Sequence, residues 1–193
     1  MAGRQRRESE PPAVRAARAR ERHLAQLAAY RFLAGLGPRR SVTVTPPPLR
    51  YWQYNPARPG LILLVLAAVA LWLGLLGWLS GAPAVAGEAP LAAALGLAVL
   101  LLSTSRLTVS DWAVSTDVAG LRRTSSFAVV PLDLVREVRS GAPPAEWPSA
   151  ARRGGWWPGR TRIAVRYLAD DGATHRAFTV WVRDPAAFAA ALR

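Results

Sequence analysis

Two long apolar runs occupy the middle of the chain and interrupt a sequence that is otherwise rich in arginine. Residues 61–79 form 19 positions without a charged side chain, and at about 1.5 Å per residue such a helix spans the roughly 30 Å hydrocarbon core of a bilayer. Residues 89–105 form a second run of 17 positions that is less rich in leucine. The stretch between them, 80–90, carries glycine and proline, which predicts a connecting loop. The pattern therefore predicts a transmembrane hairpin over residues 61–105.

Small residues recur along both predicted membrane helices, at Ala70, Gly74, Gly77, Ala92 and Gly96. Small residues on one helix face allow two backbones to pack closely, although the abundance of alanine and glycine in this chain explains them equally well. Glu88, the one charged residue between 61 and 105, falls in the predicted loop. Neither span is therefore expected to hold the ionisable group that marks an ion or proton path.

After residue 105 the apolar period shortens to two, which is typical of strands that bury one face. Six or seven short strands are predicted, and the early ones lie at 106–110, 112–116, 119–123 and 126–130. A later pair, 161–169 and 175–183, is joined by Asp170, Asp171 and Gly172, which suit a tight hairpin turn. In the first strand of this pair one face is predicted to be core and the other wet, with Ile163, Val165 and Tyr167 opposite Arg162, Ala164 and Arg166.

The last residues predict a short amphipathic helix over 185–193. Asp184 stands at the N-cap position and Pro185 at the first helical position. Phe188, Ala191 and Leu192 recur at the spacing of one helix face. We therefore expect an α+β membrane protein, in which the two-helix hairpin is followed by a small β domain over 106–193 that ends in this helix.

All 25 basic residues are arginine, and they flank the hairpin. The net charge is +9 over residues 1–60, −1 over 61–105 and +5 over 106–193. Basic flanks favour the cytoplasmic side, so both termini are predicted to be cytoplasmic in a multi-pass protein of the bacterial plasma membrane. The lysine-free, alanine- and proline-rich composition is typical of a GC-rich bacterial genome. Without cysteine the chain has no thiol nucleophile or thiolate metal site, which fits a reducing compartment.

Residues 1–60 are predicted to form a basic arm that is disordered over 1–12 and helical over 13–36. The apolar residues of that helix spread around its axis, so two interpretations stay open: contact of the arginine-rich arm with anionic lipid, and a solvated tail. Residues 41–45 alternate like a short strand that would join the sheet. Nucleic acid is not an expected partner, because no recognition helix or basic groove interleaved with aromatic residues accompanies the arginines.

Two aromatic groups are candidate contacts with the membrane or with a protein partner. The first, Tyr51, Trp52 and Tyr54, precedes the first span and is expected at headgroup depth, unless it packs on the soluble domain.

The second group is Trp156 and Trp157, which lie beside Arg160 and Arg162. Adjacent residues of an extended chain point to opposite faces, so at most one of the two tryptophans is expected in the core. The other is expected to pack under the 140–155 loop, to dip into the headgroup region or to anchor a protein partner.

The sequence carries no recognisable enzyme motif. His23 and His175 lack the spacing of a metal pair, and a turn explains the aspartates near His175. A glycine-rich phosphate loop, a nucleophile elbow and an HExxH motif are all absent from the sequence. We therefore predict no catalytic, metal-binding or cofactor-binding residues and no cofactor.

The strand pattern resembles the bacterial pleckstrin-homology-like (PH-like) domain. The most specific stretch is FAVVPLDLVREVR, which is similar to the family's pattern of strand, Pro-Leu, short turn and strand at Val130, Pro131, Leu132, Leu134, Val135 and Val138. The resemblance covers about residues 61–193 and includes the order of two membrane helices followed by a small sheet domain. It implies a PH-like β barrel or sandwich that acts in binding or assembly. The chain departs from the family in its Pro/Gly-rich insertion at 140–155 and in lacking a phosphoinositide-type basic signature in the first strand pair.

Two functions are therefore expected as alternatives. The first is a membrane-anchored adaptor or assembly factor, with the lipid bilayer and other membrane proteins as partners. The second is an accessory or regulatory subunit of a larger membrane enzyme or transporter, with the hairpin as the interface.

Overall fold

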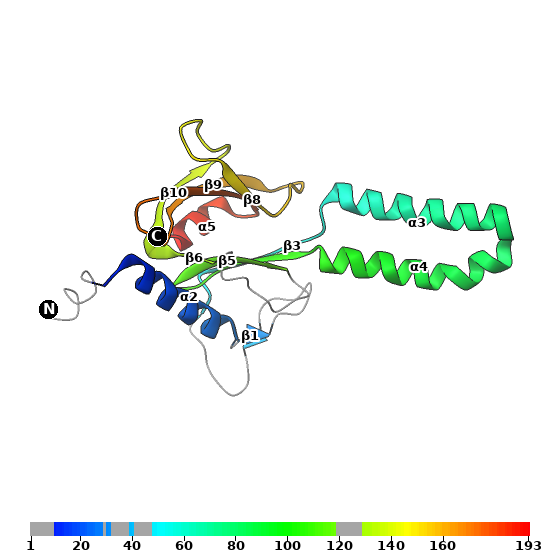
Figure 1. The fold of residues 1–193 in the computed structure, drawn as a ribbon, viewed down its shortest axis with the longest axis horizontal. Coiled ribbons are helices and arrows are strands. Elements are labelled where there is room, and N and C mark those ends of the chain that lie inside the picture. The colour runs from blue at the N-terminus through cyan, green and yellow to red at the C-terminus, as the bar shows by residue number, and fades with distance from the viewer. Residues whose placement is uncertain (1–9, 29, 32–38, 41–47, 119–128) are drawn as a thin grey trace.

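The computed structural model describes residues 10–28, 30–31, 39–40, 48–118 and 129–193, and it has an α+β domain from which a helical hairpin projects (Figure 1). The elements before and within the hairpin are α2 (Pro12–Ala28), β1 (Tyr30–Arg31), β2 (Arg39–Arg40), β3 (Tyr51–Asn55), α3 (Pro59–Ser80) and α4 (Ala82–Leu102). Those after it are β4 (Ser105–Val109), β5 (Ala113–Val118), β6 (Val130–Pro131), the 3₁₀ turn η2 (Leu132–Leu134), β7 (Val135–Ser140), β8 (Ala150–Arg153), β9 (Thr161–Leu168), β10 (His175–Val182) and α5 (Pro185–Ala191).

The domain contains two four-stranded sheets. The first has the order β3-β4-β5-β6 and the second β7-β9-β10-β8, while β1 and β2 form a separate pair. Neighbouring strands are antiparallel except β8 and β10, which run parallel. The described strands thus form an α+β fold with two distinct sheets, and their pairings do not close a barrel.

The apolar core lies between the two sheets and α5. Its buried side chains come from both sheets and the helix: Leu107, Val109, Val114, Val130, Ile163, Val165, Phe178, Val180, Val182, Phe188, Ala191 and Leu192. Tyr51 of β3 meets Phe188 of α5 edge-on, with ring centroids 5.3 Å apart. The helix therefore fills the space between the sheets, as its apolar face predicts.

The start of α5 confirms the capping prediction. The Asp184 carboxylate accepts a hydrogen bond from the Ala187 backbone N–H at 2.9 Å, and Pro185 occupies the first turn. The predicted turn before β10 is also confirmed, because the Asp171 carboxylate accepts from the backbone N–H groups of Ala173 and Thr174 at 2.8 Å. Gly172 has φ +72°, which glycine adopts without a steric penalty.

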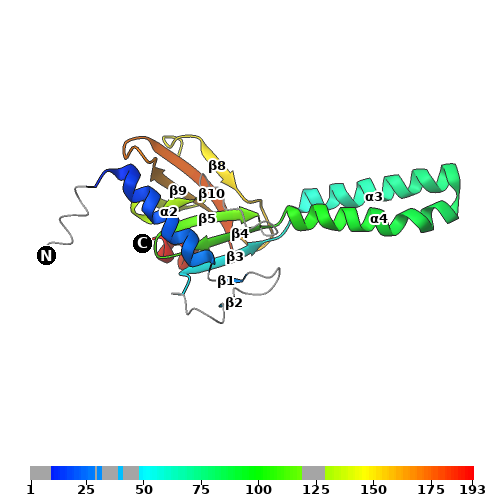
Figure 2. The same cartoon turned by 60° about the horizontal axis from the view of Figure 1, so that its bottom comes forward.

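Helix α2 packs against the first sheet, beside β5 and β6 (Figure 2). Its buried side chains are Ala16, His23, Gln26 and Leu27. The solvated-tail interpretation is therefore wrong for this part of the arm. The helix is also shorter than the predicted 13–36, because it ends at Ala28 and Tyr30 already pairs with Arg40 in the β1–β2 ribbon.

Helices α3 and α4 are both long and apolar enough to cross a membrane. A loop over 80–90 was predicted, but the two helices are joined at Gly81 alone, which has φ +82° and whose N–H bonds the Gly77 carbonyl at 3.0 Å. Pro83 lies in the first turn of α4, where its missing N–H costs nothing, and Pro90 lies inside the helix. The second helix therefore starts seven residues earlier than predicted and ends at Leu102 rather than 105.

The earlier start of α4 corrects a second prediction. Glu88 lies within the helix rather than in a loop, so one of the two candidate spans does carry an ionisable residue. Two of the small residues serve contacts inside the hairpin. A Cβ at Gly77 would lie 3.2 Å from Val85, and one at Gly96 would lie 3.2 Å from Val65, whereas nothing lies within 4 Å of a Cβ at Gly74.

The hairpin is inserted between two hydrogen-bonded neighbours of one sheet. β3 directly precedes α3, and β4 directly follows α4. The two strands pair with each other, from Tyr51 opposite Val109 to Asn55 opposite Ser105. The β domain is therefore not confined to residues 106–193, since β3 and α2 also belong to it. The strand predicted at 41–45 and nearly all of those at 119–123 and 126–130 lie outside the described residues.

The segment 140–155 is not simply a loop. It contains β8, and Trp147 at 7% exposure covers Ala164 and Ala177 on the outer face of the second sheet. Ala164 was predicted on a wet face, but it is fully buried because of this cover.

Candidate functional site

The second sheet carries a cleft of about 310 Å³ on its outer face, next to the area that Trp147 covers and beside the start of α3. Strand pairing explains how its wall is assembled. Thr179 of β10 lies opposite Arg152 of β8, and Trp181 lies opposite Arg162 of β9. Cross-strand partners share a face, so these side chains form one continuous surface. Arg58, Gly154, Gly155 and Trp156 complete the lining.

Positive charge dominates this cleft. Arg58, Arg152 and Arg162 line it, and none of the described lining residues is acidic. Within the described part of the chain none of these three arginines forms an ion pair with a carboxylate. Uncompensated guanidinium groups around one concave surface favour an anionic ligand with several oxygens, because each guanidinium offers a planar fork of donors.

Glycines bring the loop before β9 close to the segment that enters the hairpin. A Cβ added at Gly155 would lie 2.4 Å from Cγ of Arg58, so only glycine lets Arg58 lie across the loop. Gly154 adopts φ +85°, where a side chain would be strained. The arginine next to the first candidate span is therefore held at the wall of the cleft.

Arg160 fastens the same loop to β3. Its guanidinium donates to the Tyr54 carbonyl at 2.8 Å and to the Asn55 side-chain oxygen. Burial, and then the nearby charge of Arg183, lower the pKa of Arg160. Arg160 thus joins the two groups of residues that the sequence suggested separately, and it acts as a structural tie between them.

The candidate aromatic residues have different places. Trp156 is 55% exposed at the rim of the cleft, and Trp157 is half-buried. Neither belongs to the buried core, which agrees with at most one of them entering it.

The earlier aromatic group lies in β3 rather than in a loop. Tyr51 points to the core, whereas Trp52 and Tyr54 lie on the opposite face with ring centroids 6.3 Å apart. Trp52 is 41% exposed. The alternative that this group packs on the soluble domain is therefore correct for Tyr51.

Sequence reasoning did not select Arg58, Arg152, Thr179 and Trp181 as site residues. The alternation of β10 places Thr179 and Trp181 on one face, but the parallel partner β8 that brings Arg152 beside them carries no local signal.

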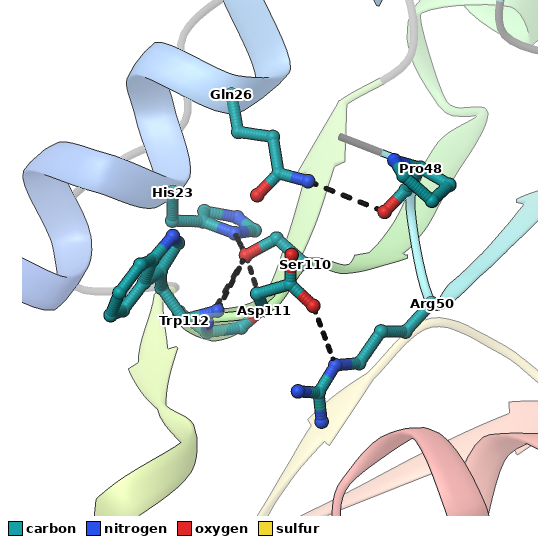
Figure 3. A network of polar contacts seen from close by, with 8 residues as sticks. His23, Gln26, Pro48, Arg50, Ser110, Asp111 and Trp112 are labelled. Carbon is teal, nitrogen blue, oxygen red and sulfur yellow. Dashed lines mark hydrogen bonds and ion pairs between the residues drawn. The ribbon is translucent and has the colours of Figure 1, made fainter. Parts of the chain in front are cut away.

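A second polar cluster lies beneath α2 (Figure 3). His23 Nδ1 and the Ser110 hydroxyl are 2.7 Å apart, and this hydroxyl also accepts from the backbone N–H groups of Trp112 and Ala113. His23 and Ser110 are both fully buried. Closed to solvent in this way, the pair anchors α2 to the β4–β5 turn rather than presenting a nucleophile.

Further contacts hold α2 in the same position. Gln26 donates to the Pro48 carbonyl at 3.4 Å, and Arg22 stacks 4.4 Å from the ring centroid of Trp112. Arg20 binds both oxygens of Asp170, at 2.5 and 2.7 Å, and this hydrogen bonding lowers the pKa of Asp170. Burial lowers the pKa of His23 to about 4, and the charge of Arg106 adds to the effect.

Among the described residues no group of three or more histidine, aspartate or glutamate side chains is placed to hold a metal ion. No protein-family model, curated protein or solved structure matches this chain. The resemblance to PH-like domains therefore stays a prediction.

Proposed function

We propose that this chain is a membrane-anchored protein whose α+β domain is an adaptor or assembly module at the cytoplasmic face of the bacterial plasma membrane. The observation that carries the proposal is the insertion of the hairpin between β3 and β4, which are paired up to Asn55 and Ser105. Only three residues separate β3 from α3 and two separate α4 from β4. Such short connections hold the domain at the membrane surface in a restricted orientation.

The cytoplasmic side is proposed from charge. Both ends of the hairpin enter the same domain, so a membrane-spanning hairpin leaves α2 and α5 on one side. Arg58 and Arg106 lie close to those ends, whereas the sequence around the tip at Gly81 contains no arginine. Positively charged flanks are retained in the cytoplasm during insertion.

The PH-like character belongs to the same proposal. Two four-stranded sheets with a C-terminal helix between them are compatible with that fold family. A domain of this kind at the membrane surface is suited to recruiting or aligning other membrane proteins, which are its proposed partners together with the bilayer itself.

Cysteine labelling in intact cells tests this topology directly, because the chain has no cysteine of its own. Ser149→Cys places an exposed thiol before β8, and Ala82→Cys places one at the hairpin tip. A membrane-impermeant maleimide is expected to label Ala82→Cys in intact cells and Ser149→Cys only after lysis. Labelling of Ser149→Cys in intact cells would contradict the cytoplasmic position of the domain.

One observation favours the alternative, an accessory subunit that binds a larger membrane protein through its hairpin. Glu88 lines an apolar groove of about 410 Å³ between α3 and α4, together with Trp72 and Ala92. It lies six residues after the start of α4, about 9 Å from the tip. A carboxylate inside a membrane is costly and typically faces a polar partner, so the proposed occupant is a foreign helix that offers a cationic or hydrogen-bond-donating side chain.

Photocrosslinking separates this alternative from the first proposal. A photoreactive residue at Ala92 lies in the groove, and one at Leu71, which is 74% exposed, lies outside the groove lining. The subunit function predicts a protein adduct at Ala92 that weakens in Glu88→Ala, and none at Leu71. Adducts with lipid alone at both positions would exclude it.

A further inference from the structure

The arginine cleft beside α3 has no counterion among the described residues that line it, and its position limits what fills it. Arg58 directly precedes Pro59, the first residue of α3. If α3 crosses the hydrocarbon core, the residue before its first turn lies where lipid phosphates lie. We infer that this cleft binds the phosphate group of an anionic phospholipid headgroup. This inference rests on the proposed membrane anchorage.

The donors suit that ligand. Arg152 and Arg162 come from two different strands and Arg58 from the segment before the hairpin, so they approach one volume from separate directions. Thr179, which lines the cleft at 4% exposure, adds a hydroxyl. Guanidinium groups recognise phosphate through paired, charge-assisted hydrogen bonds, which are about twice as strong as neutral ones.

The rim of the cleft suits a ligand whose acyl chains remain in the bilayer. Trp156 is 55% exposed beside the arginines, and indole rings favour the zone between headgroups and hydrocarbon. A volume of about 310 Å³ is in the size range of a small-ligand pocket and holds a headgroup, whereas acyl chains would remain in the bilayer next to α3. A free phosphate compound would share the recognition by arginine but would gain nothing from the adjacent span.

Lipid retention by the purified full-length chain tests the inference. The protein is extracted in a non-ionic detergent and mixed with phosphatidylglycerol or with phosphatidylcholine of the same acyl chains, and bound lipid is counted by native mass spectrometry. The wild type is expected to retain phosphatidylglycerol in preference to phosphatidylcholine. Arg152→Gln/Arg162→Gln is expected to weaken that retention about tenfold or more, because two charged hydrogen-bond donors are lost.

A matched control removes the same charge elsewhere. Arg136→Gln/Arg176→Gln replaces two exposed arginines outside the cleft and is expected to retain phosphatidylglycerol like the wild type. Arg58→Gln provides a second test variant, since Arg58 is exposed and lies outside both sheets, and it stays informative if the strand variant fails to fold. Equal retention by the wild type, the control and the Arg58 variant would overturn the inference.

Soluble competitors separate a lipid from a free phosphate compound. Inorganic phosphate and glycerol 3-phosphate are expected to displace phosphatidylglycerol only at much higher concentration. If either binds as tightly as the lipid, the assignment to a lipid headgroup is wrong. The measurement needs no membrane orientation, so a failed labelling experiment in cells and a failed retention experiment report on different claims.

Discussion

At the scale of single residues, a few arginines and one histidine connect parts of the chain that are far apart in sequence. Arg160 joins the loop before β9 to β3, and Arg20 joins α2 to the turn between β9 and β10. His23 joins α2 to the β4–β5 turn. Each contact is long-range, so each contributes to the tertiary arrangement rather than to a local element.

Arg160→Gln tests the contribution of the tie to β3. Loss of the hydrogen bonds to Tyr54 and Asn55 is expected to lower the free energy of unfolding by about 1–3 kcal/mol, because charged hydrogen bonds contribute this much. Thermal unfolding of the full chain in non-ionic detergent measures the change, with Arg136→Gln as the control for lost charge. An unchanged Tm for Arg160→Gln would show that the loop does not depend on this contact.

Because His23 is buried in its neutral form, we expect the folded chain to lose stability in mild acid. The pKa in the folded chain is about 4, below the usual 6.5, so the unfolded chain binds the proton more readily. The contribution of neutral His23 to the free energy of unfolding is fully present above pH 6.5. It declines as the pH falls toward 4, by about 3 kcal/mol in total. Denaturant unfolding from pH 7 to pH 4 measures the decline.

Two histidine variants isolate this effect from carboxylate titration. His23→Gln is expected to flatten the dependence between pH 7 and pH 4, while His175→Gln, which changes an exposed side chain, is expected to leave it as in the wild type. The same steep decline in His23→Gln would assign it to other groups.

At the scale of elements, the sequence predicted correctly those features that depend on residues close together in the chain, namely a helix cap and a hairpin turn. Asp184 and Pro185 form the start of α5, and Asp171 and Gly172 form the turn that connects β9 to β10. Each of these interactions joins residues that are within four positions of one another. The proline at 90 contributed to the predicted loop, yet α4 continues through Pro90, because a proline inside a long apolar helix is tolerated where a neighbouring helix packs against it. The strands β3 and β8 were missed because their partners lie across the hairpin and across β9.

The residues of the candidate site also fall into two groups, those that are adjacent in sequence and those that only the tertiary structure brings together. Trp156 and Trp157 with Arg160 and Arg162 were predicted as one group, because they are adjacent in sequence. Arg58 and Arg152 join the cleft only through the close approach at Gly155 and the parallel pairing of β8. Such contacts leave no periodic signal in the chain.

Asp184→Ala tests the cap of α5. The loss of the hydrogen bond to the Ala187 N–H is expected to destabilise the domain by about 1 kcal/mol. Asp184→Asn keeps an acceptor at the same position and is expected to restore most of the loss. Chemical denaturation of the three proteins provides the comparison, and equal stability of all three would show that α5 is held by its packing alone.

At the scale of the whole molecule, the α+β domain is built from residues on both sides of the hairpin. Residues 106–193 lack β3 and α2, so the fragment would leave Phe188 without Tyr51 and the β4–β5 turn without His23. The fragment is therefore expected to be unfolded or aggregated when it is expressed alone. Circular dichroism and proteolysis would reveal this, and a stable, protease-resistant fragment would contradict the two-sided domain.

A matched chain keeps both sides and removes only the hairpin. Asn55 and Ser105 are paired across β3 and β4, so replacing 56–104 by Asn-Gly forms a two-residue β-turn between them. This protein is expected to be soluble and to show cooperative unfolding, in contrast to the fragment. It lacks Arg58, and so its cleft is expected to bind anions more weakly than that of the full chain.

The position of the hairpin between β3 and β4 also sets the order of events during synthesis. β3 leaves the ribosome first and must wait for about 50 further residues before β4 appears, a delay of a few seconds at ordinary translation rates. Both apolar helices are therefore synthesised while the first sheet still lacks β4. On the proposed membrane anchorage, the hairpin therefore begins to insert before the domain is complete, and the first sheet gains β4 only after both helices have been synthesised.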